Sequence, residues 1–323
     1  MSVSRRLFLA LPVAGLIAAS MPAFAADQIK ELRIDWATYN PVSLALKDQG
    51  LLEKEFEKDG ISVTWVQSAG SNKALEFLNA GSLDFSSSAG AAALVARING
   101  NPVRSIYVYS KPEWPALVTT KDSSIKTVAD LKGKSVAVTR GTDPHIFLVR
   151  ALADAGLTEK DVTFVLLQHA DGETALIRGD VDAWAGLDPM MAAAELQDGA
   201  RLFFRNADAN SWGVLNTTED FAKDHPDIVK RVLATYEVAR KWSLANPDKL
   251  KALLAKAAKL PEDVIARQLE RNDLTYSSIG DQQKATILAA GLALQKAGVL
   301  KADVDVKAAV DALVDTDFPV AAQ

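Results

Sequence analysis

The chain has 323 residues, of which 49% are apolar and 24% charged, and this length suits two α/β lobes that each bury a core. Its formal net charge of −5 argues against nucleic acid or an anionic membrane as a partner. The sequence contains no cysteine, which excludes disulfides and any lipid anchor made by acylating a cysteine.

An export signal is predicted at the N-terminus. The pair Arg5-Arg6 precedes an apolar run, residues 7–19, that is too short to span a bilayer, and Ala23-Phe24-Ala25 is a small-residue cleavage site. We expect cleavage after Ala25, so that residues 1–25 are a signal peptide and the mature protein is free in the periplasm. The arginine pair fits the twin-arginine route and also the general secretory route. Removing both arginines makes the mature net charge about −7.

Short β-branched runs then alternate with helical patterns, which predicts mixed, mostly parallel sheets with crossover helices. The first helical pattern covers residues 44–58. From about Phe221 the pattern is helical nearly to the end. The predicted strands are residues 32–36, 61–66, 83–86, 103–109, 116–120, 135–139, 162–167, 183–185 and 201–204.

A loose internal repeat appears when the first part of the chain is compared with the region from Lys134 onward. Each copy has a strand, a polar loop ending in a proline that can open a helix (Pro41, Pro144), a Gly-Leu-x-Glu-Lys run and a second strand. Each copy then reaches a Gly-x-x-Asp corner, at Gly81 and at Gly179. Similar spacing in the two copies predicts two lobes of similar construction, although any two βαβ segments share some of these signals.

Small polar residues follow several predicted strands, where helix starts would present free amide groups to a ligand. Four such corners are residues 38–40, 68–72, 86–90 and 139–143. Three belong to the first copy and one to the second, so folding would bring them around one cleft that can hold a small oxyanion. For any single corner, helix capping is the alternative explanation.

Aromatic residues near these corners could form an apolar wall. Trp36 and Trp184 are better explained as core residues, and Tyr39 and Trp212 are the stronger candidates. Trp114, like Trp212, falls where the two lobes would join. Arg140 is the basic side chain beside a predicted anion corner, so Arg140→Ala is expected to weaken anion binding unless Arg140 faces solvent.

The usual signatures of catalysis and metal binding are missing from the sequence. His145, His169 and His225 are not in a metal-binding spacing, and no nucleophile elbow or phosphate-binding glycine loop is present. His145 follows Pro144 near the predicted cleft, but a histidine there is more often a packing residue. We therefore predict a binding protein that is not an enzyme and that uses no metal or cofactor. An exported enzyme that uses the cleft for chemistry is the alternative of a different class.

Several motifs together carry a resemblance to a known family. They are Leu46-Lys47-Asp48-Gln49-Gly50-Leu51-Leu52-Glu53-Lys54, Leu78-Asn79-Ala80-Gly81-Ser82-Leu83-Asp84-Phe85, Val128-Ala129-Asp130-Leu131-Lys132-Gly133-Lys134, Arg178-Gly179-Asp180-Val181-Asp182-Ala183-Trp184, Asp188-Pro189 and Phe221-Ala222-Lys223-Asp224-His225-Pro226-Asp227. Over nearly the whole mature chain, the sequence resembles the periplasmic substrate-binding proteins of ABC importers, in the group with the aliphatic-sulfonate, taurine and nitrate binders.

The resemblance implies a two-lobe periplasmic binding protein fold of type II with two hinge crossings, near residues 111–115 and 207–213. Lobe 1 would comprise residues 26–112 and 211–323, and lobe 2 residues 113–210. The implied function is capture of a small organic anion, such as an aliphatic sulfonate, by closure of the lobes and delivery to a membrane permease, by a protein expected to be monomeric.

The resemblance also extends the predicted site to Asp188. The full set of predicted ligand contacts is Thr38, Tyr39, Asn40, Ala69, Gly70, Ser71, Ser87, Ser88, Ala89, Arg140, Gly141, Thr142, Asp143, Asp188 and Trp212.

Two departures from the family pattern bear on the ligand. Leu187-Asp188-Pro189-Met190 stands where sulfonate binders often have Trp-Asp-Pro-Tyr, and Gly141-Thr142-Asp143 stands for their Gly-Ser-Ser. The carboxylate of Asp143 would repel an oxyanion unless it is turned away as a helix cap. An amine-bearing ligand, or a pyrimidine of the kind bound by the related thiamine-precursor binders, is therefore an alternative. A cytoplasmic precursor-synthesising protein of the same fold is opposed by the export signal and by the scarcity of histidine.

Overall fold

The structure is a computed structural model that describes residues 29–319, so the predicted signal peptide lies outside the described residues. The strands are β1 (Glu31–Trp36), β2 (Ser62–Gln67), β3 (Ser86–Ala89), β4 (Val103–Pro112), β5 (Pro115–Thr119), β6 (Ser135–Val138), β7 (Thr163–Leu166), β8 (Ala183–Leu187), β9 (Arg201–Phe204), β10 (Gly213–Thr218) and β11 (Asn272–Asp273).

Helices cover both sheets and make up most of the C-terminal part. The α-helices are α1 (Pro41–Asp48), α2 (Leu51–Phe56), α3 (Ser71–Asn79), α4 (Gly90–Ile98), α5 (Asp143–Asp154), α6 (His169–Arg178), α7 (Met190–Gln197), α8 (Glu219–Asp224), α9 (Pro226–Ala245), α10 (Pro247–Ala258), α11 (Glu262–Glu270), α12 (Asp281–Lys296) and α13 (Val306–Leu313), with short 3₁₀ turns at Glu57–Asp59, Val128–Leu131, Glu159–Asp161 and Ala207–Ala209. Among the described helices, none is long and apolar enough to cross a membrane.

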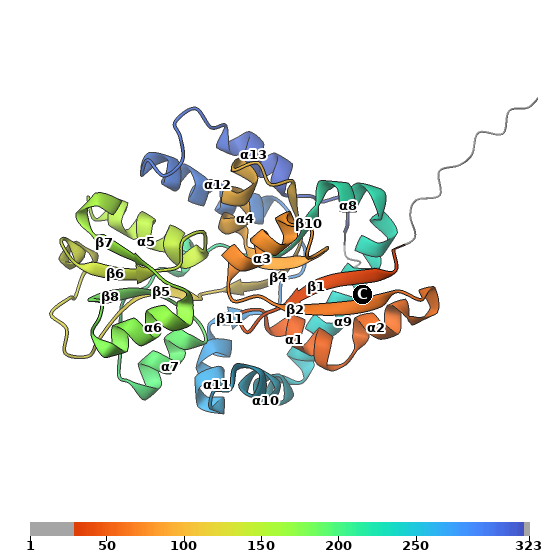
Figure 1. Ribbon diagram of the computed structural model, residues 1–323, viewed down its shortest axis with the longest axis horizontal. Helices are drawn as coiled ribbons and strands as arrows, with labels where there is room; N and C mark the ends of the chain where they lie inside the picture. Colours follow the sequence, from red (N-terminus) through yellow and green to blue (C-terminus); the bar gives the residue numbers. More distant parts are fainter. Residues whose placement is uncertain (1–28, 320–323) are drawn as a thin grey trace, which may run out of the picture.

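One lobe is built on a five-stranded sheet in the order β7-β6-β8-β5-β9. Strand β6 runs parallel to β7 and β8, whereas β5 runs antiparallel to β8 and β9. Helix α5 covers one face and packs Phe147, Leu148 and Leu152 into a buried cluster. Helices α6 and α7 cover the other face, where Leu176 and Met191 lie in a second cluster (Figure 1). Both faces are buried, which explains the nearly continuous apolar composition of these strands.

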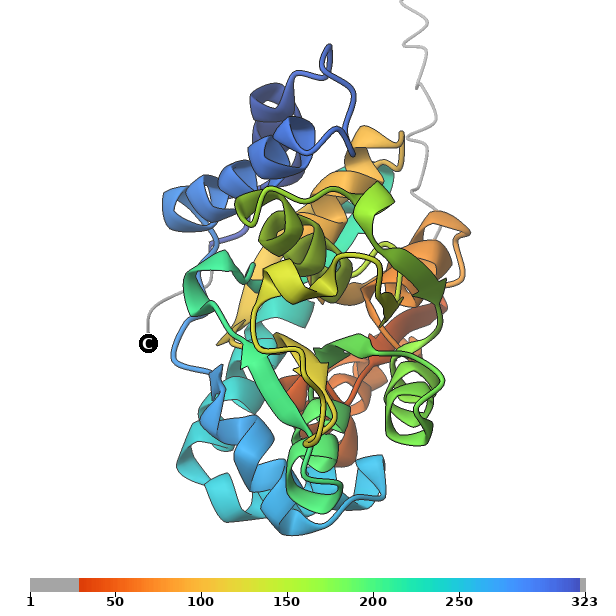
Figure 2. The same cartoon turned by 90° about the vertical axis from the view of Figure 1, so that its left-hand side faces the viewer.

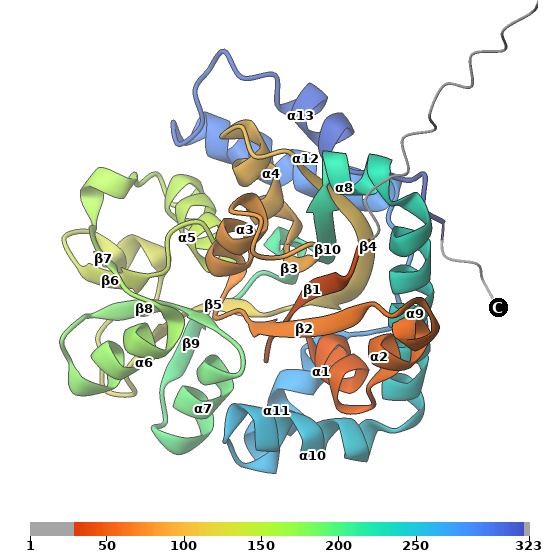
Figure 3. The same ribbon diagram turned by 45° about the vertical axis from the view of Figure 1, so that its right-hand side comes forward.

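The other lobe combines strands from both ends of the described chain (Figure 3). Strand β1 pairs in parallel with β2, and a parallel bridge from Ile34 to Phe85 places β1 beside the segment that leads into β3. Strand β10 lies antiparallel between β3 and β4, and β11 pairs with β4. The order β2-β1-β3-β10-β4 thus repeats the order of the five-stranded sheet, with the antiparallel strand in the same position.

This shared order agrees with the predicted internal repeat. The series β1-α1-β2-α3-β3 corresponds to β6-α5-β7-α6-β8. Helix α1 begins at Pro41 and α5 begins one residue before Pro144, so both predicted prolines are first-turn residues. Gly81 and Gly179 both adopt left-handed backbone conformations, with φ of 67° and 79°. Because a left-handed conformation favours glycine, the same backbone requirement explains the glycine at both corners.

Two strands differ from the sequence-based expectation. Strand β3 begins at Ser86 instead of Leu83. The Asp84 carboxylate accepts hydrogen bonds from the amide and the guanidinium of Arg33, so this residue precedes the strand instead of pairing within it. Strand β10 was not predicted, although it is the antiparallel strand at the centre of its sheet. Its sequence, Gly-Val-Leu-Asn-Thr-Thr, does not alternate between apolar and polar residues because its two faces are both buried.

The chain crosses between the two sheets twice, after β4 and again between β9 and β10. The guanidinium of Arg205 in the second crossing donates to both carboxylate oxygens of Glu113 in the first, at 2.8 and 2.6 Å. The C-terminal helices flank the crossings on opposite sides, with α12 packed against α5 and α11 packed against α7 (Figure 2). The lobes are therefore joined along the crossings and touch on both sides of them.

Candidate functional site

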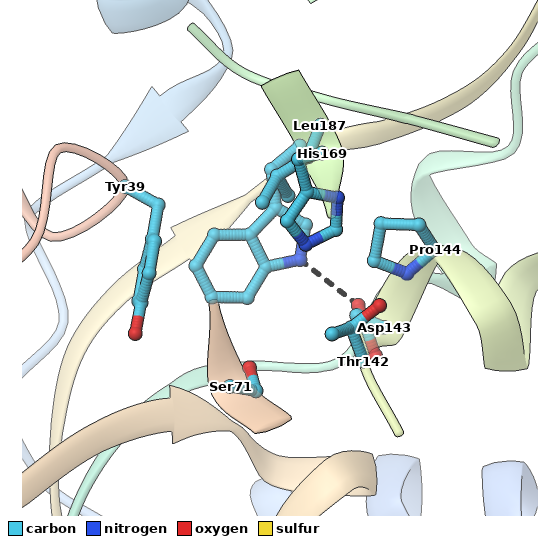
Figure 4. Close-up of a pocket in the computed structure, with 8 residues that line it drawn as sticks. Tyr39, Ser71, Thr142, Asp143, Pro144, His169 and Leu187 are labelled. Carbon is cyan, nitrogen blue, oxygen red and sulfur yellow. Dashed lines mark hydrogen bonds between the residues drawn. The ribbon is translucent and has the colours of Figure 1, made fainter. Parts of the chain in front are cut away.

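A narrow pocket with about 10 Å³ of open space lies between the two lobes (Figure 4). Its lining residues are Tyr39, Ser71, Trp114, Thr142, Asp143, Pro144, His169 and Leu187. Trp114 belongs to the first crossing, and the other residues follow the carboxyl ends of β1, β2, β6, β7 and β8. In open α/β sheets this is the edge where ligands bind. The pocket therefore lies where the internal repeat predicted a shared cleft.

Three helices begin at this pocket. Ser71 is the first residue of α3, Asp143 the first of α5 and His169 the first of α6. The first amides of a helix have no acceptor within the helix, and the helix dipole adds positive potential there. Oxygen atoms of a ligand in this pocket would therefore face amide groups from both lobes.

Tyr39 and Trp114 form an aromatic wall. Their rings are 5.9 Å apart and nearly perpendicular, at 83°. The hydroxyl of Tyr39 donates to the carbonyl of Ser87 at 3.0 Å, which fixes the ring from the opposite end. Both side chains are buried, so this wall is rigid and can contact the apolar part of a ligand.

The Asp143 carboxylate is hydrogen-bonded to one residue in each of the two crossings. It accepts hydrogen bonds from Trp114 Nε1 at 2.9 Å, from the Ser211 amide at 3.2 Å and from Ser211 Oγ at 2.7 Å. Burial raises the pKa of Asp143, and these hydrogen bonds oppose that rise. Because its oxygens point to Trp114 and Ser211, the repulsion expected against an oxyanion is reduced.

Ser71 supplies a hydroxyl on the opposite side of the pocket. Its Oγ accepts a hydrogen bond from the Ala89 amide at 3.0 Å, and a hydroxyl that accepts one bond still has a proton to donate. This contact also explains Ala89: it acts through its backbone and does not line the pocket.

The His169 side chain is 1% exposed and is oriented by Thr139. Thr139 Oγ1 donates to the carbonyl of Leu167 at 2.8 Å, so it accepts from His169 Nδ1, which lies 3.2 Å away. The remaining ring nitrogen, Nε2, has no hydrogen-bond partner among residues 29–319. Burial lowers the pKa of His169 to about 3, so the ring is neutral in the empty pocket. A methyl group on Gly70 would lie 3.0 Å from Nε2, which shows how closely the α3 loop approaches this ring.

Of the predicted contacts, the structure brings Tyr39, Ser71, Thr142 and Asp143 into the pocket. Gly70 and Gly141 are the neighbours of these residues in the chain and shape the loops. Others support the lobe behind the pocket: Asn40 caps α1 through a bond to Ser43, the Thr38 carbonyl accepts from Gln268, Ser87 binds Asp35, and Ser88 accepts from Asn216.

Four further predicted contacts also lie outside the pocket. Ala69 is exposed. Arg140 is exposed and lies 3.9 Å from Glu159, because Thr139 turns inward to His169 and the next side chain faces the other way. It lines a second cavity of about 260 Å³, between α4, α5 and the end of α12. Trp212 packs its ring on Tyr276 and donates to Thr286, so it belongs to the lobe interior.

Asp188, the fourth, joins the two lobes instead of facing the pocket. Its carboxylate lies 3.3 Å from the guanidinium of Arg271, which also binds Glu195 of α7, and it accepts from the Ala192 amide at 3.0 Å. Burial raises the pKa of Asp188 to about 7, and Arg271 opposes the rise. The preceding residue, Leu187, is the one that reaches the pocket.

Sequence reasoning ranked Trp114 too low and missed Pro144, Leu187 and His169 as pocket residues. The signal for His169 was the repeat itself, because Ser71 and His169 hold matching positions, each opening the helix after the second strand of its lobe. None of the three histidines was predicted to contact the ligand, because their spacing in the sequence is not that of a metal site. Among the described residues, no cluster of metal-binding side chains is present.

Two lobes of matching topology that meet around a pocket at the carboxyl ends of their strands define a two-lobed solute-binding protein. The model of the family described as NMT1/THI5 like matches residues 55–250. A putative aliphatic sulfonates-binding protein of Escherichia coli (strain K12) is 36% identical over 82% of this chain and 83% of its own. The chain belongs to the NMT1/THI5-like family.

Solved structures agree with this assignment. The alkanesulfonate-binding protein SsuA from Xanthomonas axonopodis pv. citri, bound to MOPS, has a TM-score of 0.80 and 27% identity, and covers 90% of this chain and 99% of its own. The periplasmic aliphatic sulphonate-binding protein SsuA from Escherichia coli has a TM-score of 0.75 and 29% identity over 91% of this chain and 95% of its own. The predicted family resemblance and two-lobe fold are confirmed.

Proposed function

We propose that this protein is the extracytoplasmic receptor of an ABC importer and that it captures an aliphatic sulfonate for delivery to the membrane permease. The observation that carries the proposal is the pocket itself, in which helix starts from both lobes face an aromatic wall. The relatives described above, which bind sulfonates, support the same ligand class.

The pocket suits a small amphiphile with one anionic end. Ser71 Oγ and the first amides of α3 and α5 would donate to the sulfonate oxygens, at roughly 1.5 to 3 kcal/mol for each hydrogen bond to a charged group. Tyr39, Trp114 and Leu187 would contact the alkyl group. The helix starts provide positive potential for the anionic end of the ligand.

The pocket is too narrow and too well enclosed to admit a ligand without movement of the lobes. Tyr39 is 4% and His169 1% exposed, and the open space inside the pocket is about 10 Å³, enough for about one water molecule. We propose that lobe 1 (residues 26–112 and 211–323) and lobe 2 (residues 113–210) rotate apart about the two crossings. Ligand contacts made to both lobes would then shift the population towards the closed form, which the permease recognises.

The cellular setting belongs to the same proposal. Export would use the signal of residues 1–25 with cleavage after Ala25, by the twin-arginine or the general route, and the mature protein would act as a monomer in the periplasm. The ligand would leave the protein unchanged, as expected of a receptor that is not an enzyme.

Calorimetric titration with ethanesulfonate, taurine, nitrate and a pyrimidine tests the ligand class. We expect ethanesulfonate to bind with a micromolar or lower Kd and Ser71→Ala to weaken it by about tenfold, the loss of one charge-assisted bond. The exposed Ala69→Ser variant is the matched control. Failure of every sulfonate to bind would refute the assignment, and chemical conversion of a bound compound would support the exported enzyme instead.

An amine-bearing ligand is the second candidate. The unpartnered His169 Nε2 accepts hydrogen bonds in its neutral form, and the Asp143 carboxylate lies in the same pocket. A ligand with an ammonium group would satisfy both. Preference for taurine over ethanesulfonate in the titration would identify this case.

A further inference from the structure

The neutral His169 ring and a sulfonate are mismatched as hydrogen-bonding partners. The Nδ1 proton is committed to Thr139, which leaves Nε2 as a lone-pair acceptor in a wall of the pocket. A sulfonate at neutral pH has only acceptor oxygens. Two hydrogen-bond acceptors in contact without water repel each other and are both left without a donor. A neutral His169 Nε2 and a sulfonate oxygen are therefore not stable neighbours in the closed pocket unless the ring or its protonation changes.

The ring cannot resolve this mismatch by turning over. A flip would break the contact between Nδ1 and Thr139 Oγ1, and Thr139 cannot donate to the flipped ring without giving up the Leu167 carbonyl. Gly70 packs against the Nε2–Cδ2 edge of the ring, because a Cβ at this glycine would lie 3.0 Å from Nε2 and 3.2 Å from Cδ2, and this close approach leaves the ring little room to turn. In the neutral tautomer with its proton on Nε2, the Nδ1 lone pair would face Thr139 Oγ1, and the Thr139 hydroxyl would have to leave the Leu167 carbonyl to donate to it. Protonation of Nε2 with the Nδ1 proton retained is the solution that keeps both of these hydrogen bonds.

We propose that His169 takes up a proton from solvent when an oxyanion occupies this pocket, so that Nε2 becomes a charged donor to the ligand and anion capture is coupled to protonation. The inference rests on the proposed function and names the group that would recognise the anion. Protonated imidazole keeps its Nδ1 bond to Thr139 and gains a donor at Nε2, and the bound anion offsets the cost of burying the positive charge. The buried ion pair formed in this way is stronger than it would be in water.

The charged and titratable groups around the ring are few. Asp143 and Tyr39 line the same pocket from α5 and from the loop after β1. Asp171 and Glu173 lie on α6 itself, and Glu195 lies on α7, which packs against α6. Burial lowers the pKa of His169, and an anion beside Nε2 would raise this pKa again.

Linkage fixes the direction of the pH effect. The free ring has a pKa of about 3, and the bound ring has a higher one. Between these two values one proton enters with each ligand, and the Kd rises about tenfold for each unit of increasing pH. Above the pKa of the bound state the affinity levels off at its weakest value.

Calorimetric titration of the whole mature protein with ethanesulfonate, at pH 5 to 8 and in buffers of different ionisation enthalpy, counts the protons taken up. We expect close to one proton per ligand at the lower pH values, together with the rise in Kd. Ethanesulfonamide is the matched probe, because its amide can donate to neutral Nε2 and should bind without proton uptake. Binding of ethanesulfonate with no proton uptake and a flat Kd would overturn the inference while leaving the receptor function intact.

Variants assign the proton to its residue. His169→Gln, which can donate but does not titrate, should abolish proton uptake and flatten the pH profile. His145→Gln should keep both, because His145 lies in the second cavity beside α12. Uptake that survives in His169→Gln, or that disappears in His145→Gln, would overturn the assignment to His169.

Nuclear magnetic resonance of histidine-labelled wild-type protein gives a readout that requires no folded variant. With three histidines in the full sequence, the ring nitrogens can be followed individually. We expect a neutral His169 ring protonated on Nδ1 in the free protein and an imidazolium in the ethanesulfonate complex. A neutral His169 ring in the complex would overturn the proposal. If no sulfonate binds at any pH, the proposed function fails as well.

Discussion

Trp114 Nε1 donates a hydrogen bond to Asp143 Oδ2 at 2.9 Å, and this bond joins the first crossing between the lobes to the start of helix α5. The same carboxylate accepts two bonds from Ser211 in the second crossing. One side chain thus holds both crossings and lines the pocket, so hinge geometry and pocket geometry are linked at Asp143.

Asp143→Ala is expected to lower the free energy of unfolding by about 1 to 3 kcal/mol, because buried donors on Trp114 and Ser211 lose their acceptor. Asp143→Asn keeps an acceptor oxygen for Trp114 and should cost less. Urea denaturation at pH 7 measures both changes. Equal losses in the two variants would mean that the hydrogen bonds to the crossings are not the source of the effect.

Arg271→Met should destabilise the contact between the lobes by about 3 to 5 kcal/mol, because it leaves Asp188 buried without its cation. Adding Asp188→Asn should recover part of the loss, since the uncompensated charge is then removed. Unfolding curves measure the stability, and small-angle X-ray scattering should detect a more open unliganded molecule. A double variant no more stable than Arg271→Met would contradict this account.

Asp35 should make the stability of the protein depend on pH. It lies beneath the pocket, fully buried, and accepts bonds from the Ser87 amide and hydroxyl at 2.9 and 2.8 Å. Burial raises its pKa from 3.8 to about 7, so the folded state holds a proton that the unfolded state releases. The resulting stability is full below about pH 4 and is lost as the pH rises to about 7.

The free energy of unfolding of Asp35→Asn, relative to that of the wild type, should therefore increase by up to about 4 kcal/mol from pH 4 to pH 8. Each pKa unit corresponds to about 1.36 kcal/mol. Denaturation midpoints at the two pH values measure this change. A difference between variant and wild type that does not change with pH would show that Asp35 stays ionised in the fold.

Gly70→Ala is expected to weaken ligand binding at least tenfold with little effect on folding. The added methyl group would lie 3.0 Å from both His169 Nε2 and Asn72 Oδ1, and the buried ring is held by Thr139 and cannot retreat. The backbone at Gly70 is extended, so the substitution causes no backbone strain. Titration calorimetry and thermal unfolding separate the two effects, and unchanged affinity would place the ligand elsewhere.

Arg140→Ala should change ligand affinity less than twofold, contrary to the expectation from sequence. The Arg140 side chain is 53% exposed, its pairing with Glu159 is an exposed one worth at most about 1 kcal/mol, and it faces the second cavity. Titration with ethanesulfonate checks this result. A large loss of affinity would move the anion site from the pocket to that cavity.

Much of the fold could be read from local sequence signals. Pro41 and Pro144 open helices, and Gly81 and Gly179 close them, because proline fixes φ and glycine tolerates positive φ wherever they occur. The repeat of these signals predicted two similar lobes and a cleft at matching helix starts. Strand β10 escaped prediction because it is buried on both faces and has no alternating pattern to detect.

The sequence by itself determined the family, the two-lobe architecture and the polar corners around the pocket, because these follow from turn chemistry, periodicity and motif order along the chain. Only the tertiary structure decided which side chains line the pocket: Trp114 and His169 do, whereas Trp212, Arg140 and Asp188 do not. The direction of a side chain at a loop depends on partners distant in sequence, such as Thr139 for His169 and Arg271 for Asp188. Local sequence carries no information about such partners until the two lobes are brought together.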